Sequence, residues 1–212
     1  MSDDRRHTEQ GIERKQQLLE AAERLFTEKG YGATRISDIC ADAGVAKGLF
    51  YWYFPTKESL FGELVRTMRL QLRRAQAGAM DPNADPVTRI RQGAVASVRF
   101  MAEHQPYFAL LDVERTDDAL AGVMKEGSDV YSGDVLRLIE AAQQQGLLAD
   151  GDPGFYVVGV LGAVSSFSHA HRMGRLTMPI DDLAQLVGDW VMQALTGRAA
   201  TAATGLDATS PR

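Results

Sequence analysis

Apolar residues recur every three or four positions along most of the chain, and this period predicts α-helices rather than strands. The first predicted helix runs from about Gln10 to Lys29, with Ile12, Leu19 and Phe26 on its apolar side. A long helix follows from about residue 60 to residue 79. Further helices are predicted over residues 86–105, 107–115, 119–145, 153–173 and 181–196, with a possible break near Gly127 or Gly133. The pattern therefore predicts an all-α fold.

Residues 35–54 predict two short helices joined by a tight turn. Gly44 ends the first helix, because glycine adopts the left-handed conformation at little cost, and Val45 fills the angle between the helices. In the second helix Leu49, Phe50 and Phe54 can face a core. The remaining residues cannot all be buried on so short a helix: Lys47, Gly48, Tyr51, Trp52 and Tyr53. This pattern is typical of a helix-turn-helix whose second helix enters the major groove of DNA.

The same segment resembles the TetR family of bacterial transcriptional regulators over about residues 12–62. The resemblance rests on Gly30-Tyr31-Gly32 after an amphipathic helix, and on Tyr51-Trp52-Tyr53-Phe54-Pro55-Thr56-Lys57-Glu58 after the turn. Arg35 stands where the family usually has a threonine, so its role in capping or in DNA contact is open. The resemblance implies an N-terminal three-helix DNA-binding domain followed by a C-terminal helical domain that binds a ligand and dimerises.

The DNA-binding residues are expected on and around the second helix of the motif. By resemblance, Tyr51 and Lys57 bind phosphate, while a solvated surface lysine is the alternative for Lys57. A base contact is expected from Lys47, Leu49, Trp52 or Tyr53, since lysine pairs with guanine in the major groove. The full expected set is Arg35, Ser37, Lys47, Gly48, Leu49, Tyr51, Trp52, Tyr53 and Lys57.

Charge separates the two predicted halves of the chain. The net charge is −5, but residues 1–80 carry 13 positive and 11 negative side chains, whereas residues 81–212 carry 10 and 17. A mildly basic N-terminal part followed by an acidic C-terminal part is compatible with DNA binding through one end of the protein. The predicted domains are a flexible arm (1–9), the DNA-binding domain (10–58), an effector-binding and dimerisation domain (59–196) and a disordered tail (197–212).

Two helices of the second half are predicted to form a homodimer through a four-helix bundle. Small residues on the helix over 153–173 allow close approach, and the last helix has a broad apolar stripe. A purely intramolecular core is the alternative. The expected interface residues are Phe155, Val158, Gly162, Ser166, Leu183, Val187 and Trp190.

A pocket for a small, mostly apolar effector is expected inside the second half, because aromatic walls with a few polar groups are typical of ligand sites. The expected lining is Met68, Leu72, Phe100, Met101, His104, Tyr107, Phe108, Tyr131 and Phe167. The function expected from these features is that of an effector-released repressor on a palindromic DNA operator. The alternatives are a constitutive or architectural DNA-binding protein and an all-α enzyme or carrier.

Other chemistry finds little support in the chain. His169 and His171 are two positions apart, so on a helix they point in different directions and cannot chelate one ion. Neither a metal nor a cofactor is expected, and no catalytic signature indicates an enzyme. The one cysteine, Cys40, excludes a disulfide framework and is expected in the core. The chain has no apolar run long enough to span a bilayer, and we expect a cytoplasmic protein without a membrane partner.

Overall fold

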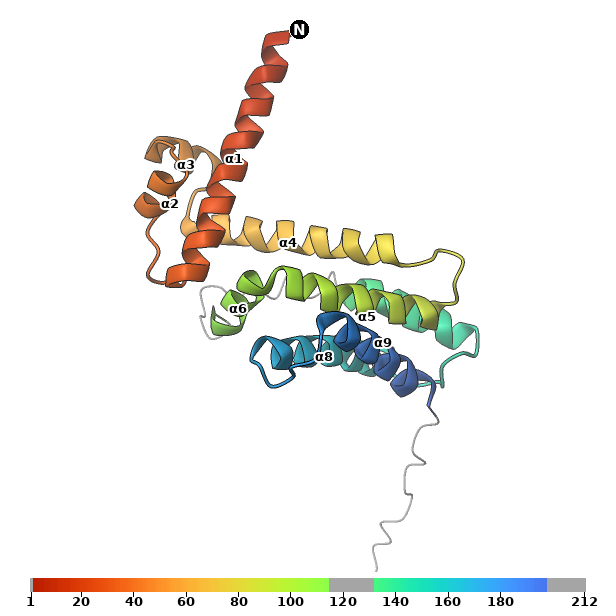
Figure 1. The fold of residues 1–212 in the computed structure, drawn as a ribbon. Helices are drawn as coiled ribbons and strands as arrows, with labels where there is room; N and C mark the ends of the chain where they lie inside the picture. Colours follow the sequence, from red (N-terminus) through yellow and green to blue (C-terminus); the bar gives the residue numbers. More distant parts are fainter. Residues whose placement is uncertain (1, 115–131, 198–212) are drawn as a thin grey trace, which may run out of the picture.

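The computed structural model describes residues 2–114 and 132–197, and the described residues form helices without a strand (Figure 1). In chain order the helices are α1 (Ser2–Lys29), α2 (Ile36–Asp42), α3 (Lys47–Tyr53), α4 (Lys57–Ala79), α5 (Pro86–Glu103), α6 (Gln105–Glu114), a helix over residues 132–144, α8 (Pro153–Arg172) and α9 (Ile180–Thr196). The all-α prediction is confirmed. No helix within these residues is both long enough and apolar enough to cross a bilayer.

One of the predicted boundaries is wrong, and a second lies outside the described residues. α1 begins at Ser2 rather than near Gln10, so residues 2–9, predicted as a flexible arm, continue the first helix. The expected helix over 119–145 is described only from residue 132 to residue 144. Tyr131, Gly127 and residues 198–212 of the predicted tail lie outside the described part of the chain.

Several turns follow from local sequence. Gly44 and Gly146 have φ angles of 64° and 68°, so each ends its helix in the left-handed conformation that glycine favours. Thr56 begins α4 by accepting a hydrogen bond from the Ser59 backbone N–H at 3.1 Å, while the Ser59 hydroxyl accepts one from the Thr56 N–H. Asp85 caps α5 in the same manner, ahead of Pro86.

The buried side chains form two core clusters, and α5 contributes to both. The first core cluster joins α1, α2, α3 and α4 to α6, and its largest fully buried members are Phe26, Phe50, Phe61 and Tyr107. The second core cluster joins α5, the helix over 132–144, α8 and α9. Because the first core cluster includes Met68, Leu72, Phe100 and Leu110, its packing continues past residue 58, where the sequence predicted a domain boundary.

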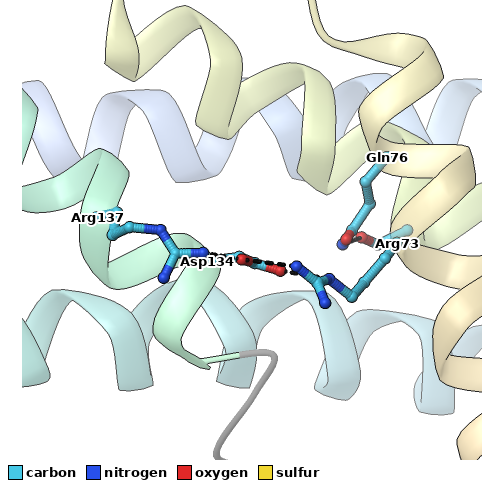
Figure 2. A network of polar contacts seen from close by, with 5 residues as sticks. Arg73, Gln76, Asp134 and Arg137 are labelled. Atoms are coloured by element: carbon cyan, nitrogen blue, oxygen red, sulfur yellow. Dashed lines mark hydrogen bonds and ion pairs between the residues drawn. The ribbon is translucent and has the colours of Figure 1, made fainter.

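Polar contacts hold the C-terminal half of α4 against its neighbours. The buried Gln76 amide donates to the Ser97 hydroxyl on α5 at 2.8 Å, and Ser97 donates in turn to the Gly93 carbonyl at 2.7 Å. On another side of α4, Arg73 holds Asp134 of the helix over 132–144, with Nε–Oδ2 and Nη2–Oδ1 distances of 2.6 and 3.1 Å. Figure 2 shows Asp134 lying between Arg73 and Arg137, which also pairs with it. α4 is therefore attached to two different helices of the second half.

α5 and α9 pack closely along one side of the second half. A methyl group added at Gly188 would lie 2.6 Å from Val95 Cγ2, so the glycine allows the two helices to approach. Arg91 of α5 donates to Asp189 and Gln185 of α9 at 2.7 and 2.8 Å. Arg99, two turns along α5, pairs with Asp181 at 2.8 Å. These contacts fix α9 on the body of the subunit.

Candidate nucleic-acid interface

The helix-turn-helix is held from one side by apolar side chains. Ile39 and Cys40 of α2 are buried, as are Phe50 of α3 and Phe54 directly after it. The Val45 backbone N–H donates to the Cys40 carbonyl at 3.0 Å, and the Val45 side chain packs against the first core cluster. Cys40 lies in the core, as predicted, and burial raises the pKa of its thiol. The turn between the helices is thus built as the sequence indicated.

The start of α2 combines a buried hydroxyl with an exposed cation. Thr34 is buried, and its hydroxyl donates to the Gly30 and Leu25 carbonyls at distances of 2.8 and 3.1 Å. Arg35 then takes the N-cap position, where its backbone N–H donates to Asp38 Oδ2 at 3.3 Å. Asp38 therefore supports the helix start. The Arg35 side chain is exposed, and so is Ser37 on the first turn of α2.

The outer side of α3 presents four of the expected DNA-binding residues. Lys47, Gly48, Tyr51 and Trp52 are all exposed, and Trp52 is 75% exposed. The Lys47 ammonium lies 5.9 Å from the centre of the Tyr51 ring, within the range of a cation–π contact. This exposed face of α3 brings together a cation, a bare stretch of backbone and two aromatic rings.

Two residues of the expected set turn away from that face. Leu49 is half-buried, as its place beside Phe50 requires. Tyr53 is also half-buried, and its hydroxyl donates to the Gly11 carbonyl on α1 at 2.8 Å. Tyr53, expected to meet DNA, thus ties α3 to α1. The sequence could not reveal this contact because the two residues lie 42 positions apart.

Lys57 also has a structural role that the sequence did not indicate. Its ammonium donates to the Tyr31 and Thr34 carbonyls at 2.7 and 2.9 Å and lies 4.1 Å from the centre of the Tyr31 ring. The lysine therefore holds the segment between α1 and α2. An ammonium has three N–H donors, so one donor remains for a phosphate. Neither of the two interpretations made from the sequence anticipated these carbonyl contacts.

A group of titratable residues, half-buried or buried, lies where the helix-turn-helix unit meets the second half. Burial raises the pKa of Glu23 on α1, and the nearby His104, at the end of α5, opposes that rise. Burial also raises the pKa of Tyr107 on α6, while Arg69 of α4 opposes it. The ring of His104 stacks on Phe100, with centroids 4.0 Å apart. Four elements thus meet where the two halves of the protein join.

The expected pocket residues are divided between the two core clusters. Met68, Leu72, Phe100 and Tyr107 are buried in the first core cluster and Phe108 packs against it, whereas Met101 and Phe167 pack against the second. A hollow of about 360 Å³ lies elsewhere, between α4, α5 and α9. It is lined by Ala75, Ala79, Arg91, Gln92, Val95, Ala96, Arg99, Phe100, Glu103 and Gln185. Phe100 alone belongs to both sets, and the small alanines that open the hollow carry no sequence signal for a ligand.

The expected dimer residues divide into an exposed set and a buried set. Phe155 and Val158 on α8 are 75% and 72% exposed, and Gly162, Ser166 and Trp190 are exposed too. Leu183 and Val187 lie in the second core cluster of the same subunit, each 2% exposed, so their assignment to an interface is wrong.

Leu186, which is exposed one turn before Trp190 on α9, is absent from the expected set. The apolar residues of α9 form two stripes along the helix, offset by one position. Only the stripe that contains Leu183 and Val187 packs in the second core cluster. The Trp190 ring lies 5.8 Å from the Phe167 ring of α8 between centroids, so the two helices are in contact there. The exposed residues of α8 and α9 are called the α8–α9 face below.

His171 of α8 makes a polar contact within the subunit. His171 Nε2 lies 3.1 Å from the Met178 carbonyl, in the loop before α9. Across the described ranges, no group of three His, Cys, Asp or Glu side chains is arranged to hold a metal ion.

Comparison with known proteins connects this geometry to a family. Residues 18–64 match the family model described as bacterial regulatory proteins, tetR family. The chain is 27% identical over 133 residues to the HTH-type transcriptional regulator YhgD of Bacillus subtilis, and this match covers 63% of each chain. It is 26% identical over 180 residues to the HTH-type transcriptional repressor NicS of Pseudomonas putida, covering 82% of this chain and 85% of the relative.

The fold is shared along almost the whole described length. A putative TetR-family transcriptional regulator from Syntrophomonas wolfei superposes with a TM-score of 0.80 at 19% identity, covering 90% of this chain and 98% of the other. The similarity to solved structures thus extends well beyond the segment that the family model matches.

The carbonyl contacts of Lys57 generate a prediction about stability. Lys57→Ala removes a charged donor from two carbonyls, so we expect the free energy of unfolding to fall by about 1–3 kcal/mol in urea titrations. Lys47→Ala is the matched control: its side chain is exposed, and we expect a change within about 0.5 kcal/mol. Equal stability of the two variants would contradict the structural role of Lys57.

Proposed function

Because the chain belongs to the TetR family of bacterial regulatory proteins, we propose that it is a transcriptional regulator that binds duplex DNA through the exposed face of α3. The observation that carries this proposal is the set Lys47, Gly48, Tyr51 and Trp52, exposed together on a short helix whose opposite side is buried. In a helix-turn-helix such a face enters the major groove.

The residues of this interface divide by chemistry. Tyr51 has a hydroxyl at the edge of the face, suited to a phosphate oxygen, and Lys57 keeps one donor for the same purpose. Lys47 can donate to guanine O6 and N7. Arg35 and Ser37, exposed at the start of α2, extend the set toward the DNA backbone. Tyr53 is proposed to support α3 through its hydrogen bond to α1 and not to contact the DNA itself.

The active species proposed is a homodimer joined through the α8–α9 face. A monomeric protein rarely exposes many large apolar side chains together. Here Phe155 and Val158 are exposed on α8, whose glycines and serines are exposed as well, and Leu186 and Trp190 are exposed on α9. Two copies related by a two-fold axis would bury these residues and form a four-helix bundle. A dimer with this symmetry binds a palindromic operator, with recognition helices roughly 34–36 Å apart.

Regulation is proposed to occur by release of the operator when a small, mostly apolar effector binds the second half. Two observations support this. The hollow between α4, α5 and α9 has a volume of about 360 Å³, within the range of small-molecule sites, and it combines Phe100, Val95 and alanines with an arginine and glutamine rim. α4, which forms one wall, also carries the helix-turn-helix at its other end. An effector that displaces α4 therefore changes the spacing of the recognition helices.

The relatives favour repression within this proposal. NicS is named a transcriptional repressor, and the chain matches most of its length.

To change a population from 99% DNA-competent to 99% released, the effector must prefer the released state by about 10⁴-fold. The competing proposal is a constitutive regulator, in which α4 stays fixed by Gln76 and Arg73 and no compound releases the operator.

DNA binding through α3 is tested by two substitutions. We expect Tyr51→Phe to weaken binding to all duplexes similarly, and Lys47→Ala to weaken operator binding by about 1–3 kcal/mol with altered base preference. Titration of labelled duplexes at several salt concentrations measures both effects. Arg74→Ala, which removes an exposed cation from the far half of α4, should leave affinity unchanged. Wild-type affinity in both α3 variants would rule the interface out.

Dimerisation is tested by a pair of charge insertions. Gly162 is exposed, and a side chain started there meets no atom within 4 Å, so we expect Gly162→Arg to fold but to sediment as a monomer with little operator affinity. Val187→Glu instead places a carboxylate in the second core cluster and should unfold the subunit. A folded, monomeric wild-type protein that still binds a palindrome tightly would refute the dimer.

The effector proposal is tested by filling the hollow. A thermal-shift screen of apolar compounds should find one that stabilises the protein and releases the operator. Ala79→Leu narrows the hollow, so a higher concentration of that compound should be needed, while operator binding without it stays normal. Ala77→Leu, exposed on α4 outside the hollow, is the control. If no compound releases the operator, the constitutive regulator is the better description.

A further inference from the structure

Trp52 is held in a fixed position although its side chain is mostly exposed. Its ring lies 4.6 Å from the Tyr53 ring, centroid to centroid, at an interplanar angle of 85°. Tyr53 is fixed in turn, because its hydroxyl donates to the Gly11 carbonyl of α1 and its ring packs against the first core cluster. The indole is therefore supported along one edge by a residue that is itself anchored, and its remaining surface faces outward.

Gly48 lies one helical turn before Trp52, on the same side of α3. It is exposed, and a methyl group added to it would meet no atom within 4 Å. The backbone at this point is bare, so another molecule can approach α3 closely next to the indole. At Gly48 and Trp52, α3 therefore presents the flat apolar surface of the indole beside backbone that no side chain covers.

The chemistry of the Gly48–Trp52 surface is selective among the base edges of the major groove. The indole offers an apolar plane and one N–H donor, but no acceptor. Each base pair presents hydrogen-bonding groups in the major groove, whereas thymine alone presents a methyl group. A surface with no acceptor and a large apolar area gains most from that methyl group.

We propose that Trp52 is a specificity-determining residue that reads the C5-methyl group of a thymine lying over Gly48, in each half of the operator. Tyr53 is its positioning residue. The inference rests on the proposed DNA-binding function and adds the base that α3 selects at one position. Burying one methyl-sized group is worth about a fourfold change in affinity, which sets the size of the effect.

Replacing thymine by deoxyuridine tests this, because the substitution removes the methyl group and leaves the hydrogen-bonding groups in place. The duplex is first obtained by selecting tight binders from a randomised pool with the wild-type protein. Each thymine is then replaced singly. We expect one position in each half-site at which deoxyuridine weakens wild-type binding about fourfold. We expect Trp52→Ala to bind the thymine and deoxyuridine duplexes equally.

Three variants separate the reading of the methyl group from general binding. Lys47→Ala should lower affinity but keep the ratio between thymine and deoxyuridine duplexes. Trp52→Phe should retain part of that ratio. Tyr53→Phe removes the hydrogen bond to Gly11 and should reduce the ratio while the base preference of Lys47 persists. Circular dichroism checks that each variant folds, as the exposure of Trp52 leads us to expect.

The outcomes distinguish this inference from the function on which it rests. If wild-type protein binds its duplex in a Lys47-dependent manner but no thymine is sensitive to deoxyuridine, Trp52 does not read a methyl group and the regulator remains. The same holds if folded Trp52→Ala keeps the full ratio. If the wild-type protein selects no duplex at all, the proposed function fails and the inference fails with it.

Discussion

Two helices of seven residues each do not hold their shape in water, because so short a helix cannot offset the cost of starting it. α2 and α3 are stable here because one side of each is buried against α1 and α4. Phe50 supplies most of this from α3, and it packs in a cluster with Phe26 and Phe61. Since α3 is anchored through one side, its other side is free for Lys47, Tyr51 and Trp52, and the proposed function depends on that division.

Polar contacts complete this anchoring at the places where apolar packing ends. Thr34 and Lys57 satisfy carbonyls between α1 and α2, and Tyr53 joins α3 to Gly11. The bonds of Lys57 and Tyr53 connect residues that are far apart in the chain, so they fix how α1, α3 and α4 are oriented to one another. An unpaired buried carbonyl is costly, which gives these three side chains more effect on stability than their partial exposure suggests.

α4 couples the position of the helix-turn-helix unit to the second half of the protein, because it makes contacts in both. Its N-terminal half lies in the first core cluster, while its C-terminal half is attached to α5 through Gln76 and to the helix over 132–144 through Arg73. The Gln76 contact is buried, so breaking it would leave buried polar groups unpaired, whereas the Arg73 ion pair is partly exposed and contributes roughly 0.2–1 kcal/mol. The side of α4 that meets the hollow carries only alanines. A ligand there would contact α4 without competing with a bulky side chain.

The sequence by itself determined the helices, the turn and the exposed character of α3. Those features depend on residues that lie close together in the chain: Gly44 at the turn, Phe50 and Phe54 on one side, Lys47 and Trp52 on the other. Tertiary structure alone decided which of two neighbouring stripes on α9 faces inward, burying Val187 and exposing Leu186, because the amphipathic pattern fits both. It also decided that Tyr53 meets Gly11 and that Lys57 meets carbonyls. Those contacts join residues at least 23 positions apart, and no local pattern specifies which distant backbone group a side chain will reach.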